Sequence, residues 1–246
     1  NTLIATVFVK IANEGAGYTN KYGTFVLAEG NMTTVNGTLF YYDEKGVEHA
    51  DVFEKANAGA EVGNVLQDMF IANNKIYFIT QNGDQQGGLN RFVVCNSETM
   101  KAEFSDPLVF TTPKGVGTWP QHIVITGKNK GYVQYSDNAM ETTSGICAIQ
   151  FDDKSVSVTH HVTGTFGEFT VKGATKSRMI YSRGKVYAAC GHSVVIIDPN
   201  NDKAVEKKIE FPGRQTKDIV KAADGNLYVA LASPYEGESR YVATLK

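Results

Sequence analysis

The sequence predicts an all-β fold, a β-propeller built from four-stranded antiparallel blades. One hairpin signature recurs four times along the 246 residues. The recurrences are 41 to 55 residues apart, which is the length of a propeller blade. No segment longer than ten residues combines a helical period of apolar residues with capping residues. A β-sandwich also has many short strands, but it does not require the same hairpin four times.

Each copy of the hairpin signature has two polar residues, an apolar run, a tight polar turn and a second strand with a tyrosine. The copies begin at Gln67, Gln121, Ser177 and Lys217, and their tyrosines are Tyr77, Tyr132, Tyr187 and Tyr228. The turns are rich in Asn, Gly and Lys, which suit tight hairpins. A second hairpin follows in each unit, with strands such as RFVVC, GICAIQF and SVVIIDP.

A related unit precedes the four copies and reads YGTFVLAEGN, GTLFYYDEKG and VEHADVFEKA. The strand around residues 4–10 is the candidate for its missing partner. The glycines and asparagines of EKANAGAEVGNVL favour a loop. We therefore expect five units in one domain over residues 1–246, the last without its outer strand.

The composition excludes several classes of function. The 26 acidic and 24 basic residues are scattered, so nothing favours nucleic acid or an anionic membrane as a partner. No apolar stretch is long enough to span a membrane. Cys95, Cys147 and Cys190 lie in apolar runs and are expected to be buried free thiols. No metal-binding, nucleophile or phosphate-binding motif is present, and we predict no catalytic residue, metal or cofactor.

Loop lengths predict which face of the propeller carries function. The first-to-second and third-to-fourth turns of each unit are short and fall on one face. The second-to-third loops and the connections between units are longer and fall on the opposite face. Because long loops tend to carry function, we expect the binding surface on the long-loop face.

Polar pairs open four of the units, where the innermost strand enters the channel from the long-loop face. They are Gln67 with Asp68, Gln121 with His122, Ser177 with Arg178, and Lys217 with Asp218. Together they are expected to surround the channel mouth with donors, acceptors and mixed charge. The same residues can instead join neighbouring blades and cap the inner strands, and the sequence leaves both interpretations open.

Trp119 is the single tryptophan and lies in GVGTWPQH, where glycines and Pro120 favour a loop. It can stack on a planar ligand or pack as a plug between blades. Tyr135 and Tyr235 belong to other long loops of the same face. The predicted ligand-binding set is Trp119, Gln121, His122, Arg178, Asp68 and Asp218, with Tyr135 and Tyr235 at the rim.

The chain resembles the YncE-like, surface-layer-type β-propellers of Gram-negative gut anaerobes. The resemblance is carried by YGTFVLAEGN, GTLFYYD, VGNVLQDMFIANNKIYFIT, SRGKVYAACGHSVVIIDPNN and ADGNLYVALA. It implies an exported, lipid-anchored protein at the cell surface or in the periplasm, accessory to an outer-membrane nutrient transporter. One branch of that family captures cobalamin. Its members typically have seven blades, whereas five units are visible here.

The resulting hypothesis is a non-enzymatic protein that binds a small molecule, either corrinoid-like or another medium-sized cofactor. Two alternatives stay open. One is a propeller enzyme of the lyase or lactonase type with its site at the channel mouth. The other is a protein-interaction scaffold, which would present a broad apolar patch instead of a pocket.

Overall fold

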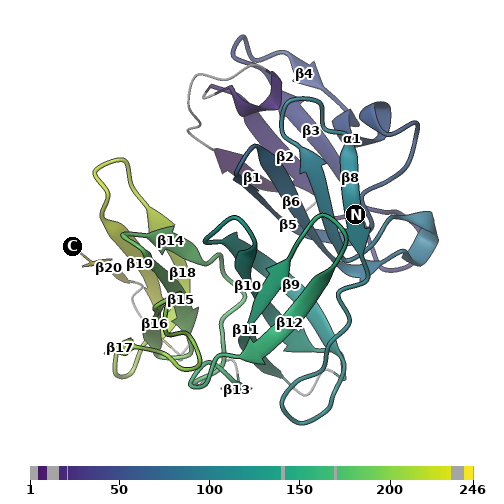
Figure 1. Ribbon diagram of the computed structural model, residues 1–246. Helices are drawn as coiled ribbons and strands as arrows, with labels where there is room; N and C mark the ends of the chain where they lie inside the picture. Colours follow the sequence, from purple (N-terminus) through teal and green to yellow (C-terminus); the bar gives the residue numbers. More distant parts are fainter. Residues whose placement is uncertain are drawn as a thin grey trace. The chain divides into compact units, whose positions relative to one another are not determined.

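The computed structural model describes residues 5–9, 17–20, 22–139, 142–168, 171–233 and 241–245. These residues form five antiparallel sheets, and consecutive strands of each sheet are neighbours in chain order (Figure 1). Such successive meanders are the blades of a β-propeller, so the predicted fold class is confirmed. Among the described residues, no helix is long and apolar enough to cross a membrane.

The chain divides into two compact units. The first comprises residues 1–108 and 152–156, and the second comprises residues 109–151 and 157–246. The expectation of a single domain over residues 1–246 stays a prediction.

The first unit contains two four-stranded blades, and the expected partner strand at the start of the chain is present as β1. Its strands are β1 (Ala5–Val9), β2 (Thr24–Ala28), β3 (Thr38–Tyr42) and β4 (Glu48–His49), followed by β5 (Asn64–Ala72), β6 (Lys75–Gly83), β7 (Phe92–Asn96) and β8 (Ala102–Asp106). Short 3₁₀ turns occur at Gly17–Thr19 and Gln85–Gly87.

A short helix, α1 (Val52–Ala56), lies where the sequence favoured a loop. Val52 and Phe53 are buried in the core of the first unit. The ring of Phe53 packs edge-on against Phe78 of β6, with ring centroids 5.8 Å apart. Burial of these two side chains, rather than helix propensity, therefore explains the single helical turn.

The second unit contains three blades, the last with three strands among the described residues. Its strands are β9 (Thr118–Ile125), β10 (Lys130–Asp137), β11 (Thr143–Phe151), β12 (Val156–His161) and β13 (Gly167–Glu168); then β14 (Ile180–Ser182), β15 (Lys185–Cys190), β16 (Ser193–Ile197) and β17 (Lys207–Glu210); and finally β18 (Gln215–Lys221), β19 (Leu227–Ala232) and β20 (Tyr241–Leu245). The short β13 pairs with β11 at the side of its sheet.

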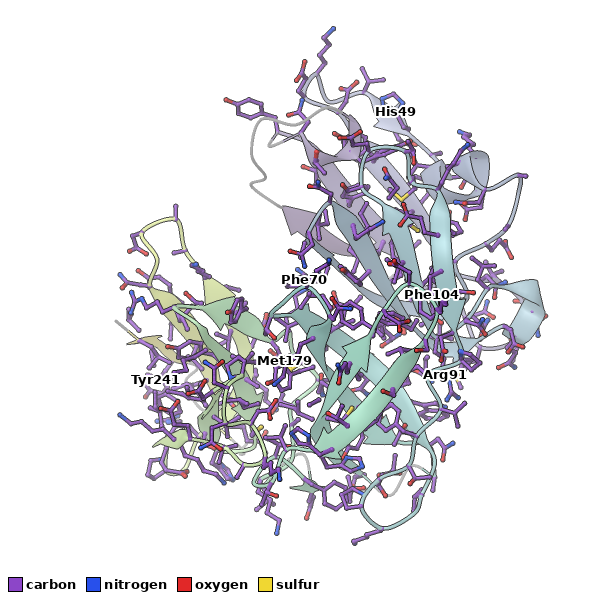
Figure 2. The ribbon with its side chains drawn as sticks, viewed as in Figure 1. His49, Phe70, Arg91, Phe104, Met179 and Tyr241 are labelled. Atoms are coloured by element: carbon purple, nitrogen blue, oxygen red, sulfur yellow. The ribbon has the colours of Figure 1, made fainter. Side chains whose placement is uncertain are left out.

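The four repeated tyrosines lie on the second strand of their blades, as the repeat predicts. They are Tyr77 on β6, Tyr132 on β10, Tyr187 on β15 and Tyr228 on β19. Each faces an apolar residue of the first strand: Phe70, Val124, Ile180 and Val220 in the same order. Phe70 is labelled in Figure 2. The sequence repeat therefore has the correct register in all four blades.

The three cysteines are free and buried, which confirms the prediction. Burial raises the pKa of the Cys190 thiol to about 12. Burial also raises the pKa values of the other two thiols. All three thiols are therefore protonated at neutral pH and act as small apolar side chains.

One carboxylate joins the third blade to the fourth. The hydroxyl of the fully buried Tyr132 donates a hydrogen bond to Asp202 Oδ2 at 2.5 Å. The Lys130 ammonium lies 2.7 Å from the same oxygen, and His160 Nε2 lies 3.2 Å from Oδ1. Asp202 stands in the turn between β16 and β17, so it holds that turn against β10 and β12.

The pKa of Asp202 reflects this set of contacts. Burial by itself would raise the pKa, but hydrogen bonds from Lys130 and Tyr132 and the nearby positive charges outweigh it. The pKa is held below its usual value. The link between the blades therefore contains an ionised carboxylate at neutral pH.

We expect Tyr132→Phe to lower the free energy of unfolding by about 1.5–3 kcal/mol, because it removes a buried hydrogen bond to a charged group. Tyr187→Phe is the matched control, since the described residues offer its hydroxyl no hydrogen-bond partner. Chemical denaturation of both variants measures the difference. Equal stability losses would show that the Asp202 contact contributes nothing specific.

The Asp202 link should also depend on pH. A carboxyl whose pKa is lowered by folding stabilises the protein above its unfolded pKa of about 3.9, and this contribution is lost as the pH falls through the folded value. The stability gap between wild type and Asp202→Asn should therefore be largest at neutral pH and shrink below about pH 4. The exposed Asp84→Asn serves as control in denaturation curves across that range. A gap that does not change with pH would contradict the assignment.

Candidate functional site

Four charged or titratable candidates occupy one equivalent position in four blades. Each lies two residues before the apolar partner of the blade's tyrosine: Asp68, His122, Arg178 and Asp218. In the three blades where the first strand extends this far, the residue faces Ile79, Gln134 or Ala230 on the second strand. The polar pairs predicted from the repeat are therefore structurally equivalent.

A β-bulge marks the same place in three of these blades. The strand register shifts so that Gln67 of β5, Gln121 of β9 and Lys217 of β18 have no counterpart on the second strand. A bulge interrupts the ladder and redirects the side chains beside it. In these three blades the first residue of the polar pair is thus the extra residue of a bulge, which explains why polar residues are tolerated there.

The two aspartates have a local structural contact in common. Asp68 Oδ1 accepts the backbone N–H of Met69 at 2.9 Å, and Asp218 Oδ1 accepts that of Ile219 at 2.9 Å. Asp218 Oδ1 also accepts a hydrogen bond from Ser177 Oγ at 2.8 Å, which joins the fourth and fifth blades. Asp68 is buried, whereas Asp218 is exposed. The aspartates therefore cap the inner strands, and Asp218 also joins neighbouring blades. These contacts match the second of the two interpretations that the sequence left open.

Gln121 belongs to an amide network. Gln134 Nε2 donates to Gln121 Oε1 at 3.0 Å and to the carbonyl of Ala174 at 3.4 Å. Gln121 Nε2 donates to Ser136 Oγ at 2.8 Å. The network joins β9 and β10 to the segment that leads to Arg178 in the next blade.

Two candidates differ from their sequence-based placement. Trp119 lies within β9 and pairs with Ser136, so the expectation of a loop was wrong. Pro120 is tolerated because β9 is the edge strand of its sheet and the bulge follows directly. Trp119 remains half-buried.

Tyr135 does not lie at a rim. It is fully buried in β10, and its hydroxyl bonds to His161 Nδ1 at 2.8 Å. Its ring packs edge-on against Phe110, with centroids 5.2 Å apart. The placement at the rim is therefore corrected, because this side chain fills the interior of the blade. Tyr235 lies outside the described residues.

In the second unit, most of the remaining candidates lie on or next to strands that border one another. The first strand of its middle blade, β14, contacts both β9 and β18. The strand that follows Arg178 therefore borders both β9, which carries Trp119, Gln121 and His122, and β18, which carries Asp218. Trp119, Gln121, His122 and Arg178 are half-buried and Asp218 is exposed, so all five reach the surface of this unit. Asp68 occupies the equivalent position in the first unit.

Sequence reasoning missed Gln134, which is 1% exposed. The equivalent residues, two positions after each tyrosine, are Ile79, Ala189 and Ala230. Gln134 is therefore the polar exception at an apolar position. Aligning the four tyrosines and comparing the residues that follow them would have revealed it.

A separate cleft of about 560 Å³ lies in the first unit and was also missed. Its lining includes Tyr18, Glu48, His49, Lys55 and Thr99. His49, labelled in Figure 2, lies with Nε2 3.2 Å from Asp43 Oδ2. These residues come from a 3₁₀ turn, the two-residue β4, α1 and the β7–β8 turn, which share no pattern in the sequence.

Within the described ranges, no three His, Cys, Asp or Glu side chains converge closely enough to hold a metal ion.

Solved structures with the same fold differ widely from the chain in sequence. A protein described as a hypothetical selenium-binding protein from Sulfolobus tokodaii matches with a TM-score of 0.57 and 12% identity, over 91% of this chain and 59% of that one. The chain thus spans less than two thirds of that protein. A protein from Thermus thermophilus, described as an oxidoreductase (glucose dehydrogenase), matches with a TM-score of 0.54 and 12% identity, over 95% and 86% of the two chains. At such identity the likeness shows the propeller fold alone.

No curated protein matches the chain by sequence. Residues 22–234 match a protein family described as a domain of unknown function, DUF5074. The match covers most of the chain and includes all four hairpin copies. The chain is therefore a member of the DUF5074 family.

Proposed function

We propose that this β-propeller is a non-enzymatic protein that binds a medium-sized cofactor, corrinoid-like in its combination of planar and polar parts. The site lies in the second unit, at Trp119, Gln121, His122, Arg178 and Asp218. The resemblance to YncE-like, surface-layer-type propellers supports a place outside the cytoplasm. It also supports an accessory role beside an outer-membrane nutrient transporter, with a lipid anchor on the precursor.

The observation that carries the proposal is the variety of side chains at one equivalent position. The four residues are two aspartates, a histidine and an arginine. A position with a purely structural role would need the same chemistry in each blade, as the aspartates show by bonding the next backbone N–H. His122 and Arg178 replace that carboxylate with different groups. This divergence supports a role in recognition in the third and fourth blades.

The chemistry of the five residues favours a ligand with both planar and polar parts. Trp119 offers a large aromatic surface, and Arg178 offers a forked donor group that can also stack on planar systems. His122 and Gln121 add shorter polar groups, and Asp218 adds an acceptor. Such a mixed lining is typical of small-molecule sites, where a few polar groups fix the orientation of the ligand. The two similar structures share only the fold with this chain, so their descriptions do not bear on the ligand of this site.

The first test is a thermal-shift screen with corrinoids, haem, siderophores and glycans, because a ligand that binds the folded state raises Tm by mass action. For a hit, Arg178→Ala should weaken binding by about tenfold or more. Arg183→Ala is the matched control, as an exposed arginine in the β14–β15 turn of the same blade. Calorimetric titration measures both affinities. Loss of binding in His49→Ala instead would place the site in the cleft of the first unit.

The second test concerns the aromatic contact of Trp119. Trp119→Ala should lower affinity for the hit by roughly 1–3 kcal/mol if the indole stacks on the ligand, whereas Trp119→Phe should retain part of it. The same titration applies, with circular dichroism as a check on folding. Unchanged affinity in Trp119→Ala would show that the indole is packing between strands. Conversion of the hit to a product would favour the lyase or lactonase alternative.

A further inference from the structure

Two buried polar oxygens lie beside the proposed site and have no hydrogen-bond partner among the described residues. They are Gln134 Oε1 on β10 and Thr175 Oγ1 in the segment before β14. Gln134 is 1% exposed, and its amide already contacts the carbonyl of Ala174, the neighbour of Thr175. Both oxygens therefore belong to the contact between the third and fourth blades.

The orientation of the Gln134 amide is fixed by its surroundings. Its NH₂ group contacts two acceptors, the carbonyl of Ala174 and Gln121 Oε1. Turning the amide over would place an oxygen against the Ala174 carbonyl, which can only accept. Oε1 is therefore the end without a partner, and it can only accept a hydrogen bond.

An unpaired buried acceptor costs about 1–3 kcal/mol, so its retention needs a reason. The blade itself does not need the amide, because Ile79, Ala189 and Ala230 occupy the equivalent positions. Nor does the Ala174 carbonyl depend on Gln134, because Ser144 Oγ donates to it at 2.5 Å. A donor from outside the chain would supply the hydrogen bond that Gln134 Oε1 lacks.

Gln134 is next to the residues of the proposed site. It pairs directly with His122 across β9 and β10, so the two side chains share one face of the sheet. Gln121, the half-buried extra residue of the bulge, accepts a hydrogen bond from its amide. Gln134 is therefore linked directly to two residues of the proposed site.

We infer that Gln134 is a specificity-determining residue of the ligand site and accepts a hydrogen bond from an uncharged donor of the ligand, an amide N–H or a hydroxyl. This inference rests on the proposed function. A charged donor is disfavoured because burying an ammonium group at this depth carries a large desolvation cost. Thr175 Oγ1 serves as the second polar contact, since a hydroxyl can accept or donate.

The test compares acetamide with acetate, which has a similar shape but no donor at neutral pH. The amide resonance of Gln134 in ¹⁵N-labelled protein is identified by its absence in Gln134→Met, a change that keeps the volume but removes the amide. Acetamide should shift this resonance and acetate should not. Equal responses to the two compounds, or none to either, would overturn the inference.

Ser144→Ala separates recognition from a merely structural role. It removes the other hydrogen bond to Ala174 and leaves Gln134 intact. For a hit of the ligand screen, Gln134→Met should lower affinity by about tenfold, the effect of one lost hydrogen bond, and Ser144→Ala should leave it nearly unchanged. A hit that binds Gln134→Met normally overturns this inference but not the proposed function. If acetamide alone shifts the Gln134 resonance but the ligand screen gives no hit, the acceptor role of Gln134 is supported and the proposed function is not.

Discussion

The pairing of the first two strands around one tyrosine is the constraint on which four of the five blades depend. Each tyrosine faces an apolar residue of the innermost strand, which fixes the strand register. A slip by one residue would turn every side chain to the opposite face of the sheet. Because the register is fixed, the residue two positions earlier has a defined place in each of these four blades. In three blades a bulge next to this residue interrupts the hydrogen-bonded ladder at the start of the polar pair.

This arrangement separates the part of each blade that must stay constant from the part that can vary. The tyrosine and its apolar partner maintain the sheet, and Asp68 and Asp218 support the strand end through the following backbone N–H. The third and fourth blades place His122 and Arg178 at the same position. A repeat protein can change such positions one blade at a time without disturbing its core, since each blade keeps its own register.

Features that repeat from blade to blade could be predicted from the sequence. Residues that depart from the repeat were misplaced or missed. The hairpins, the five blades, the buried cysteines and the equivalence of the polar pairs follow from spacing and alternation. Trp119 was misplaced because Pro120 and nearby glycines favour a loop, whereas an edge strand with a bulge accommodates them. Tyr135 was misplaced because its strand continues to Asp137, so the side chain faces the interior. Gln134 was missed because an isolated polar residue in an apolar strand has meaning only after the blades are aligned.

The contact of Tyr132, Lys130 and His160 with Asp202 has a mechanical consequence. The β16–β17 turn of the fourth blade is fastened to two strands of the third, so these two blades resist sliding past one another. The amide network at Ala174 fastens the same two blades a second time. Two separate attachment points oppose rotation as well as translation. The junction that carries Gln121, His122 and Arg178 is thereby stiffened before any partner arrives, and a stiff surface loses little conformational entropy when it is occupied.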